Sequence, residues 1–323
     1  MLNLSITACS FSLKKSNTIG NKSVFYLNKP IKMRVSGEQI IYNNSFEFFS
    51  NFFKANNTII DDEENKRAFK CTYNNEKYET DDFIIYPVLI NSGTYGSTSD
   101  IINIKTKNIQ YKKKNTDVDF KQFYFFIVFP KDNLDVSIQK GMFIFQNIGP
   151  YGIKTLITEK LQEFLSDIYS ITLNCKTISP ELFVKKVLNE KSIKQITMIK
   201  NYKSSDSLDN YNLGYGQEIK TLAKLNFKEP MWEKIKSSML YVSGAKNRVF
   251  EFEDIKYDAV KVLVEIGGRM RKISLNNIEN LSIIESIPDD IKTISGNPDK
   301  EKLIEYLKEV IKEYLEEMVL NFE

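Results

Sequence analysis

The chain has 323 residues, 42% of them hydrophobic and 27% charged, a composition that fits an ordinary globular protein and excludes a disordered or fibrous one. Its formal net charge is only +3, and no run of about 18 consecutive apolar residues indicates a transmembrane helix. Histidine is absent, which excludes Ser-His-Asp and Cys-His catalysis and zinc sites built on histidine.

The first 135 residues predict a strand-rich domain. In its opening stretch, MLNLSITACS, residues 6–9 resemble a lipoprotein cleavage box. The segment before them lacks the positive charge and apolar length of a signal peptide, so we expect a buried first strand. Further strands are predicted over 25–27, 31–35, 82–91 and 123–129, with Pro87 indicating an edge strand and residues 111–117 forming a basic turn.

An aromatic helix is predicted within this domain. Residues 45–57 place Phe46, Phe49 and Phe53 on one helical face, with Phe48 and Phe52 beside it. A stripe of this kind is most often core packing. The alternative is a platform on which nucleic-acid bases stack.

From residue 136 to residue 323 strands and helices alternate, which predicts a second domain. Strands are predicted over 141–147, 170–177, 193–199, 218–227 and 249–255, helices over 153–168, 179–189 and from Pro230, and a polar loop over 201–216. A hairpin over 258–275 turns at Gly267-Gly268, where a two-residue turn needs positive φ. The predicted class is therefore α+β, with antiparallel or mixed sheets.

A long helix over 298–320 closes the chain. Its apolar stripe contains Leu303, Leu307, Val310, Tyr314 and Met318, and the opposite face is rich in Glu and Lys. A stripe of this width must be covered, either by its own domain or by a partner chain. The sequence leaves both alternatives open.

The stretch QNIGPYGIKTLITEKL, residues 146–161, approaches a phosphate-binding loop but departs from it. A Walker loop needs GxxxxGK[ST], whereas here two residues separate the glycines and Ile153 stands between Gly152 and Lys154. Pro150 also removes one backbone donor. Two interpretations remain. The stretch is simply a strand end and a helix start, or the amides of residues 152–155, beside Lys154, bind one backbone phosphate of a nucleic acid.

Several basic residues are candidates for nucleic-acid contacts. Arg269 and Arg271 share one face of the 258–275 hairpin and are predicted to extend beyond the core edge, with Lys272 on the other face. Lys112, Lys113 and Lys114 form a basic run, and Lys246 and Arg248 precede the strand at 249. The alternative for each group is a solvated surface, which for the hairpin would also resist edge pairing.

No catalytic constellation is recognised, so no enzyme activity, cofactor or metal is predicted. Asp258 and Glu265 fall on opposite faces of their strand, and the residue two beyond Glu265 is glycine where a metal-dependent nuclease would carry lysine. The acidic run 61–64 reads as a solvated loop. Cys9, Cys71 and Cys175 are too widely spaced for a CxxC site and are expected to be partly buried free thiols in a reducing cytoplasm.

Charge is distributed unevenly along the chain. From Glu285 to Glu323 there are 11 acidic and 5 basic residues, so the rest of the chain carries 40 basic and 31 acidic residues, or +9. A basic body with an acidic terminal segment is compatible with a polyanionic partner.

The order of elements from residue 141 to about 321 resembles the RexA family, the phage-exclusion DNA-binding proteins of lambda-type prophages. Three stretches carry the resemblance: GMFIFQNIGPYGIKTLITEKL, then KQITMIK with EIKTLAKLNFKEPMWEKIKSSM, and FEDIKYDAVKVLVEIGGRMRKISL with the C-terminal helix. The resemblance implies a homodimer that binds double-stranded DNA without strong sequence preference, in anti-phage defence. It implies no enzyme activity.

The leading hypothesis is a cytoplasmic, dimeric DNA-binding protein of a phage-exclusion or abortive-infection system, with no small-molecule substrate. A membrane protein encoded next to this chain would support it. Two alternatives stay open: a protein-interaction or phage-sensing subunit that does not bind DNA, and a metal-dependent nuclease with carboxylates assembled from distant positions.

Overall fold

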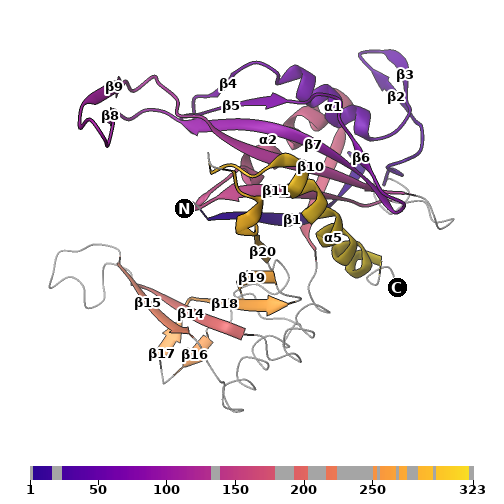
Figure 1. Cartoon of the computed structure of the whole chain (residues 1–323). Helices are drawn as coiled ribbons and strands as arrows, with labels where there is room; N and C mark the ends of the chain where they lie inside the picture. The colour runs from indigo at the N-terminus through magenta and orange to yellow at the C-terminus, as the bar shows by residue number, and fades with distance from the viewer. Residues whose placement is uncertain are drawn as a thin grey trace.

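The framework of the molecule is one antiparallel sheet, which has 14 strands in the described part of the chain (Figure 1). The computed structural model describes residues 3–16, 24–131, 139–178, 193–202, 216–223, 250–252, 255–266, 269–274, 283–293 and 296–319. The α+β class predicted from the sequence is confirmed, with antiparallel pairing. The predicted helices over 179–189 and from Pro230, most of the loop 201–216 and the Gly267-Gly268 turn lie outside the described residues.

The first half of the sheet is built from the N-terminal strands and those around residues 141–177. Its strands are β1 (Leu4–Lys15), β4 (Ile60–Asp62), β5 (Arg67–Thr72), β6 (Tyr78–Glu79), β7 (Phe83–Thr94), β10 (Lys121–Pro130), β11 (Gly141–Ile148), β12 (Tyr151–Gly152) and β13 (Ile171–Thr177). The second half contains β14 (Ile193–Tyr202), β15 (Gly216–Ala223), β18 (Ala259–Ile266), β19 (Arg269–Ser274) and β20 (Ile283–Ser286).

The main path through the sheet is β15-β14-β18-β19-β20-β1-β11-β10-β7-β5-β4. Strand β1 joins the two halves, because it pairs with β11 along one edge and with both β20 and β13 along the other. The sheet therefore crosses the predicted domain boundary at residue 135, while the division into two domains itself stays a prediction.

Three pairs of strands stand apart from the sheet as two-stranded ribbons. They are β2 (Ile31–Val35) with β3 (Glu38–Tyr42), β8 (Ser99–Ile102) with β9 (Ile109–Lys113), and β16 (Phe250–Phe252) with β17 (Ile255–Tyr257).

Two predictions about strands of the N-terminal part are wrong. Residues 25–27 form no strand, and next to them only Val24 forms an isolated bridge, to Lys14. The strand predicted over 82–91 is β7, but it is not an edge strand, because β10 pairs along one side and β5 and β6 along the other.

The helices cover both faces of the first half of the sheet (Figure 1). Helices α1 (Phe46–Ala55) and α2 (Lys154–Tyr169) lie on one face, α5 (Lys300–Val319) lies on the other, and a 3₁₀ turn η4 (Asp289–Ile291) precedes α5. The alternation of β10 shows the two faces: the Phe125 ring lies 6.2 Å from that of Phe53 in α1, while Tyr124 points to the side of Lys300 in α5. No described helix is both long enough and apolar enough to span a bilayer.

Aromatic packing forms the core beneath α1. All five phenylalanines of this helix are buried, as the core interpretation of the stripe predicts. The Phe49 ring meets those of Phe11 at 5.4 Å and Phe143 at 5.6 Å, both edge to face. These contacts place the stripe in the core, so it cannot serve as a base-stacking platform in this fold.

The C-terminal helix packs within its own chain. Leu303, Leu307 and Val310 are fully buried, and Tyr314 is 2% exposed. Of the two alternatives for covering this stripe, the structure shows the intramolecular one. These four residues are therefore not available as a dimer interface, while the side chain of Met318 lies outside the described part of the helix.

Replacement of Phe49 by alanine should lower the free energy of unfolding by about 3–5 kcal/mol, because the cavity it leaves is lined by rings that cannot close around it. Urea denaturation followed by fluorescence measures this. Ile41→Ala is the control, since Ile41 is 57% exposed and its truncation should change stability by less than about 0.5 kcal/mol. Equal losses in the two variants would contradict the assigned core.

Candidate nucleic-acid interface

The described basic candidates fall in three separate regions of the fold. Lys112 and Lys113 belong to β9 and Lys114 follows it, Lys154 is the first residue of α2, and Arg269, Arg271 and Lys272 belong to β19. Lys246 and Arg248 lie outside the described residues, as does the side chain of Arg269.

The hairpin β18–β19 and the lysine run are far apart in the sheet. The β8–β9 ribbon leaves the end of β7, and the strands β20, β1, β11 and β10 lie between β19 and β7. At about 4.8 Å per strand, five steps place β19 about 24 Å from β7. Arg271 and Lys272 therefore do not extend the surface that carries Lys112, Lys113 and Lys114.

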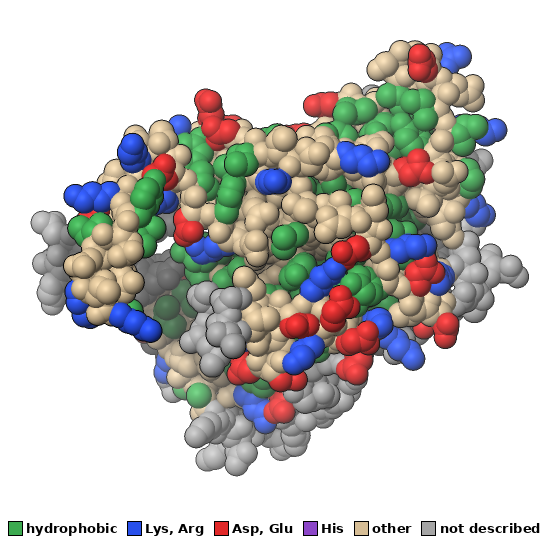
Figure 2. Space-filling model, turned by 45° about the horizontal axis from the view of Figure 1, so that its top comes forward, with side chains coloured by type: hydrophobic (Ala, Val, Ile, Leu, Met, Phe, Trp, Pro, Cys, Tyr) green, Lys and Arg blue, Asp and Glu red, His purple; other side chains and the backbone are tan. Residues whose placement is uncertain are grey.

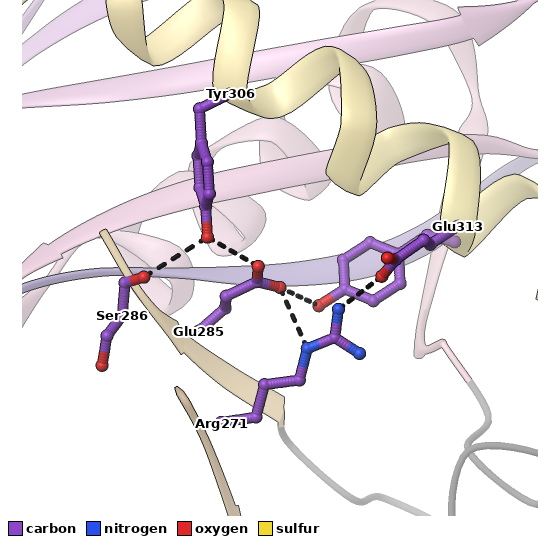
Figure 3. Close-up of polar contacts among 6 residues, drawn as sticks. Arg271, Glu285, Ser286, Tyr306 and Glu313 are labelled. Carbon is purple, nitrogen blue, oxygen red and sulfur yellow. Dashed lines mark hydrogen bonds and ion pairs between the residues drawn. The ribbon is translucent and has the colours of Figure 1, made fainter. Parts of the chain in front are cut away.

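Arg271 corrects the sequence prediction, because its side chain does not extend beyond the core edge. It is 2% exposed and lies between β20 and α5 (Figure 3). Its Nε is 3.4 Å from Oε2 of Glu285, and its Nη2 donates to Oε2 of Glu313 at 2.5 Å. The alternation of β19 places Lys272 on the opposite, exposed side, as predicted.

The carboxylate of Glu285 is the centre of this buried network. It is fully buried and accepts hydrogen bonds from the hydroxyls of Tyr306, at 2.6 Å, and Tyr314, at 3.1 Å (Figure 3). Burial lowers the pKa of Arg271, but the charge of Glu285 and the contacts of Tyr314 and Glu313 outweigh burial and raise it overall. The network is therefore a charged link between β19, β20 and α5, and a structural role explains Arg271 fully.

Lys154 begins α2 at a strand-to-helix turn. Gly149, with φ of 56°, lets the chain reverse from β11 into β12, and the carbonyl of Gly152 accepts a hydrogen bond from Nη2 of Arg67 at 3.0 Å. The helix start predicted at this glycine turn is confirmed. Lys154 is half-buried there and Tyr151 is exposed.

The ribbon formed by β8 and β9 is the most distinctive surface feature. It projects from the body at the left of Figure 1. Every residue of β8 and the first four of β9 are exposed. The sequence-based prediction of a basic turn over 111–117 is wrong for residues 111–113, which form the second strand of this ribbon.

The ribbon is anchored where it leaves the sheet. The Tyr111 hydroxyl donates to the Asp117 carboxylate, which also accepts from the backbone N–H of Lys114 at 2.7 Å. Gly96 N–H donates to the carbonyl of Asn115 at 2.7 Å. The bond between Gly96 and Asn115 joins the two ends of the ribbon, and the bonds to Asp117 hold the turn by which the chain returns towards β10.

Positive charge and apolar side chains are combined on the ribbon. Between residues 99 and 115 there are five lysines and one aspartate, a net charge of +4. The lysines are Lys105, Lys107, Lys112, Lys113 and Lys114, and the exposed apolar side chains are Ile101, Ile102, Ile104, Ile109 and Tyr111. Figure 2 shows blue and green side chains mixed over this region at the left of the view.

The sequence prediction missed Lys105, Lys107 and the isoleucines around them. The signal was a pair of short segments containing isoleucine, 99–102 and 109–113, on either side of the mostly polar stretch 103–108, an order compatible with a hairpin. Because neither strand has a buried face, the usual contrast between a polar and an apolar side is absent.

The described residues contain no group of three or more Cys, Asp or Glu side chains arranged to hold a metal ion. The three cysteines are free, with Cys9 and Cys71 buried and Cys175 half-buried, as predicted. Burial raises the pKa of the Cys71 thiol to about 12, so this thiol is protonated at neutral pH.

The fold and the ribbon define an α+β protein that presents a basic two-stranded arm. Neither the protein-family models nor the curated proteins nor the solved structures contain a match to this chain. The resemblance to the RexA family therefore stays a prediction.

Replacing Arg271 by methionine should lower the free energy of unfolding by about 3–5 kcal/mol, because it leaves the buried charge of Glu285 without its cation. Thermal or urea denaturation measures the loss. Lys272→Met is the matched control on the next residue of β19, where the side chain is exposed, and should change stability by less than about 0.5 kcal/mol. If Arg271→Met were as stable as the control, the network would not link β19 to α5.

Proposed function

We propose that this protein binds double-stranded DNA without strong sequence preference and that the β8–β9 ribbon is its main contact. The observation that supports the proposal is the projecting ribbon itself, which carries a net charge of +4 on an arm with no face buried against the body. An arm of this kind has no role in the core. Its positive charge and extended shape are suited to binding along the length of a polyanion.

A two-stranded ribbon is an element that proteins place in a groove of the double helix. Such ribbons lie in the major groove in some complexes and in the minor groove in others, and phosphates then run along both edges of the arm. Register pairs Asp100 with Lys112 and Ser99 with Lys113, so consecutive lysines of β9 point to opposite faces of the ribbon. Lysines on both faces can meet phosphates on both strands of the DNA.

The side chains of the ribbon explain the weak sequence preference. Lysine is a flexible point charge that binds phosphate without fixed orientation, whereas base recognition depends on planar, bidentate groups such as arginine or asparagine at base edges. Between residues 99 and 115 there are five lysines and no arginine, and of the three asparagines Asn103 uses its side-chain oxygen within the turn of the ribbon. Binding would therefore depend on counterion release and on salt more than on sequence.

The biological context proposed for this activity is a phage-exclusion or abortive-infection system, on the basis of the family resemblance. A homodimer would place two ribbons on one duplex and increase the affinity by linking two binding events. Its interface would have to lie elsewhere than the apolar stripe of α5, which is buried in its own chain.

A second candidate is favoured by the exposed isoleucines. Ile101, Ile102 and Ile109 are each about half exposed, which is also compatible with a ribbon that docks on another protein. Binding to a protein partner would depend little on salt, whereas binding to DNA would depend on it steeply. A salt titration therefore separates the two candidates.

Replacing Lys105, Lys107, Lys112 and Lys114 together by glutamine should weaken binding to a 40-base-pair duplex by about 100-fold or more at 50 mM salt. If each lysine neutralises one phosphate, the slope of log K against log salt should also fall by about 3–4. Fluorescence anisotropy with two unrelated duplex sequences measures both quantities, and the loss should be the same for both.

The control carries the same change in net charge at exposed lysines outside the ribbon: Lys32, Lys54, Lys302 and Lys312 replaced by glutamine. It should retain most of the affinity and the salt slope. Equal weakening in the two variants would show that net charge, and not the ribbon, determines binding. No binding by the unaltered chain at 50 mM salt would refute the proposal.

A further inference from the structure

The tip of the β8–β9 ribbon is a well-ordered loop closed by hydrogen bonds. The N–H of Asn103 donates to the carbonyl of Asn108 at 2.9 Å, and the N–H of Lys107 donates to the carbonyl of Asn103 at 2.7 Å. The Asn103 side-chain oxygen accepts from the N–H groups of Lys105 and Thr106 at 2.9 and 3.2 Å. Lys107 adopts a left-handed conformation, with φ of 62°, that completes the turn.

This loop presents one apolar side chain at its apex. Ile104 is 75% exposed, the highest value for any large hydrophobic side chain in the described part of the chain. It follows Asn103, whose hydrogen bonds fix the backbone on either side of it. A branched aliphatic group is thus held in water by an ordered turn, where a polar residue would serve the turn equally well.

The residues around Ile104 are positively charged. Lys105 and Lys107 follow it in the same turn, and both are exposed. No acidic residue occurs between residues 101 and 116. An apolar apex flanked by cations complements the surface of a nucleic acid, in which stacked bases lie between two rows of phosphates. It is poorly matched to an apolar protein groove, which would have to desolvate both lysines.

We propose that Ile104 acts as a wedge: the ribbon follows the minor groove, and Ile104 enters between two base pairs and kinks the duplex. This inference rests on the proposed DNA binding and adds deformation of the DNA to it. Apolar side chains inserted from the minor groove partly unstack one base step and bend DNA by about 20–90° towards the major groove. Lys105 and Lys107 bind the phosphates that flank the opened step.

Insertion between base pairs would explain why Ile104 is exposed to solvent in the unbound protein. Unstacking one base step costs a few kcal/mol, and the cost is recovered when the bent duplex contacts more of the protein surface. Insertion also needs no base-specific hydrogen bond, so it is compatible with binding to any sequence. Flexible pyrimidine–purine steps should be the preferred points of entry, because they unstack most easily.

The test uses the full-length chain and a 20-base-pair duplex with a donor and an acceptor fluorophore at its ends. At saturating protein and low salt, energy transfer should rise when the unaltered protein binds, because bending brings the ends together. Ile104→Ala should bind within about threefold of the unaltered affinity, since the lysines remain, but should give little or no rise in energy transfer.

A second readout uses a duplex with a two-nucleotide bulge, which is already kinked. The unaltered protein should bind it about tenfold more tightly than the perfect duplex, a difference of about 1.4 kcal/mol, because part of the deformation cost has been removed. Ile104→Ala should bind the two duplexes equally. This comparison measures the wedge through affinity alone and is independent of the fluorophores.

Ile102→Ala is the matched control. It removes the same atoms from a side chain that is 55% exposed on the same ribbon but lies in the strand, away from the apex. It should retain both the bend and the preference for the bulged duplex. Since both isoleucines are exposed, neither substitution threatens the fold, which thermal denaturation verifies.

The outcomes separate the two proposals. Binding without bending, or bending retained in Ile104→Ala, would overturn the wedge and leave DNA binding in place. Bending lost equally in Ile102→Ala and Ile104→Ala would show that the apolar ribbon as a whole, and not its apex, deforms the DNA. Failure of the unaltered chain to bind either duplex would refute DNA binding, and the wedge with it.

Discussion

The pairing of β7 with β10 is the constraint on which the proposed site depends. The two strands pair without interruption from Lys121 opposite Ser92 to Pro130 opposite Phe83. The chain between them has to leave and re-enter the sheet at the same point, and it does so as the β8–β9 ribbon. At the base of the ribbon, Ser92, Gly93 and Thr94 of β7 also pair with β5. The base is therefore held by three paired strands, β5, β7 and β10.

The second half of the sheet is held in a different way. Among the described strands, β20 alone carries the ladder from β19 to β1. The connection between the halves is reinforced by charge through Arg271, Glu285 and Glu313. A buried ion pair contributes little to stability compared with a well-packed apolar contact, but it tolerates few alternative arrangements. Two tyrosine hydroxyls fill the remaining acceptor positions of Glu285. This link fixes the orientation of β19 relative to α5 more than it adds to the total stability.

The sequence predicted most of the framework but only part of the candidate site. Helices α1, α2 and α5 were predictable because their apolar residues recur at helical spacing, and β10 and β11 because long apolar runs fit buried strands. Arg271 was misplaced because the hairpin pattern fixes which face a residue occupies but not what covers that face. The cover is α5, a separate element of the chain whose Glu313, 42 positions after Arg271, contacts the Arg271 guanidinium. For Pro87 the reasoning was sound locally: β6 pairs only as far as Ile85 and β5 only from Leu89, so at Pro87 itself only β10 pairs with β7.

The ribbon shows why a count of basic residues is a poor guide to a binding surface. Lys112, Lys113 and Lys114 attract attention because they are adjacent, yet Lys105 and Lys107, in the loop that joins β8 to β9, belong to the same projecting ribbon. The ribbon also carries exposed isoleucines, with Ile101 opposite Tyr111 and Ile102 opposite Ile109, and a lysine run that served only solubility would have no use for them. Exposed apolar area is unfavourable in water, and the lysines are costly to bury. The proposed partner matches such a surface, because a double helix has stacked apolar bases between two rows of phosphates.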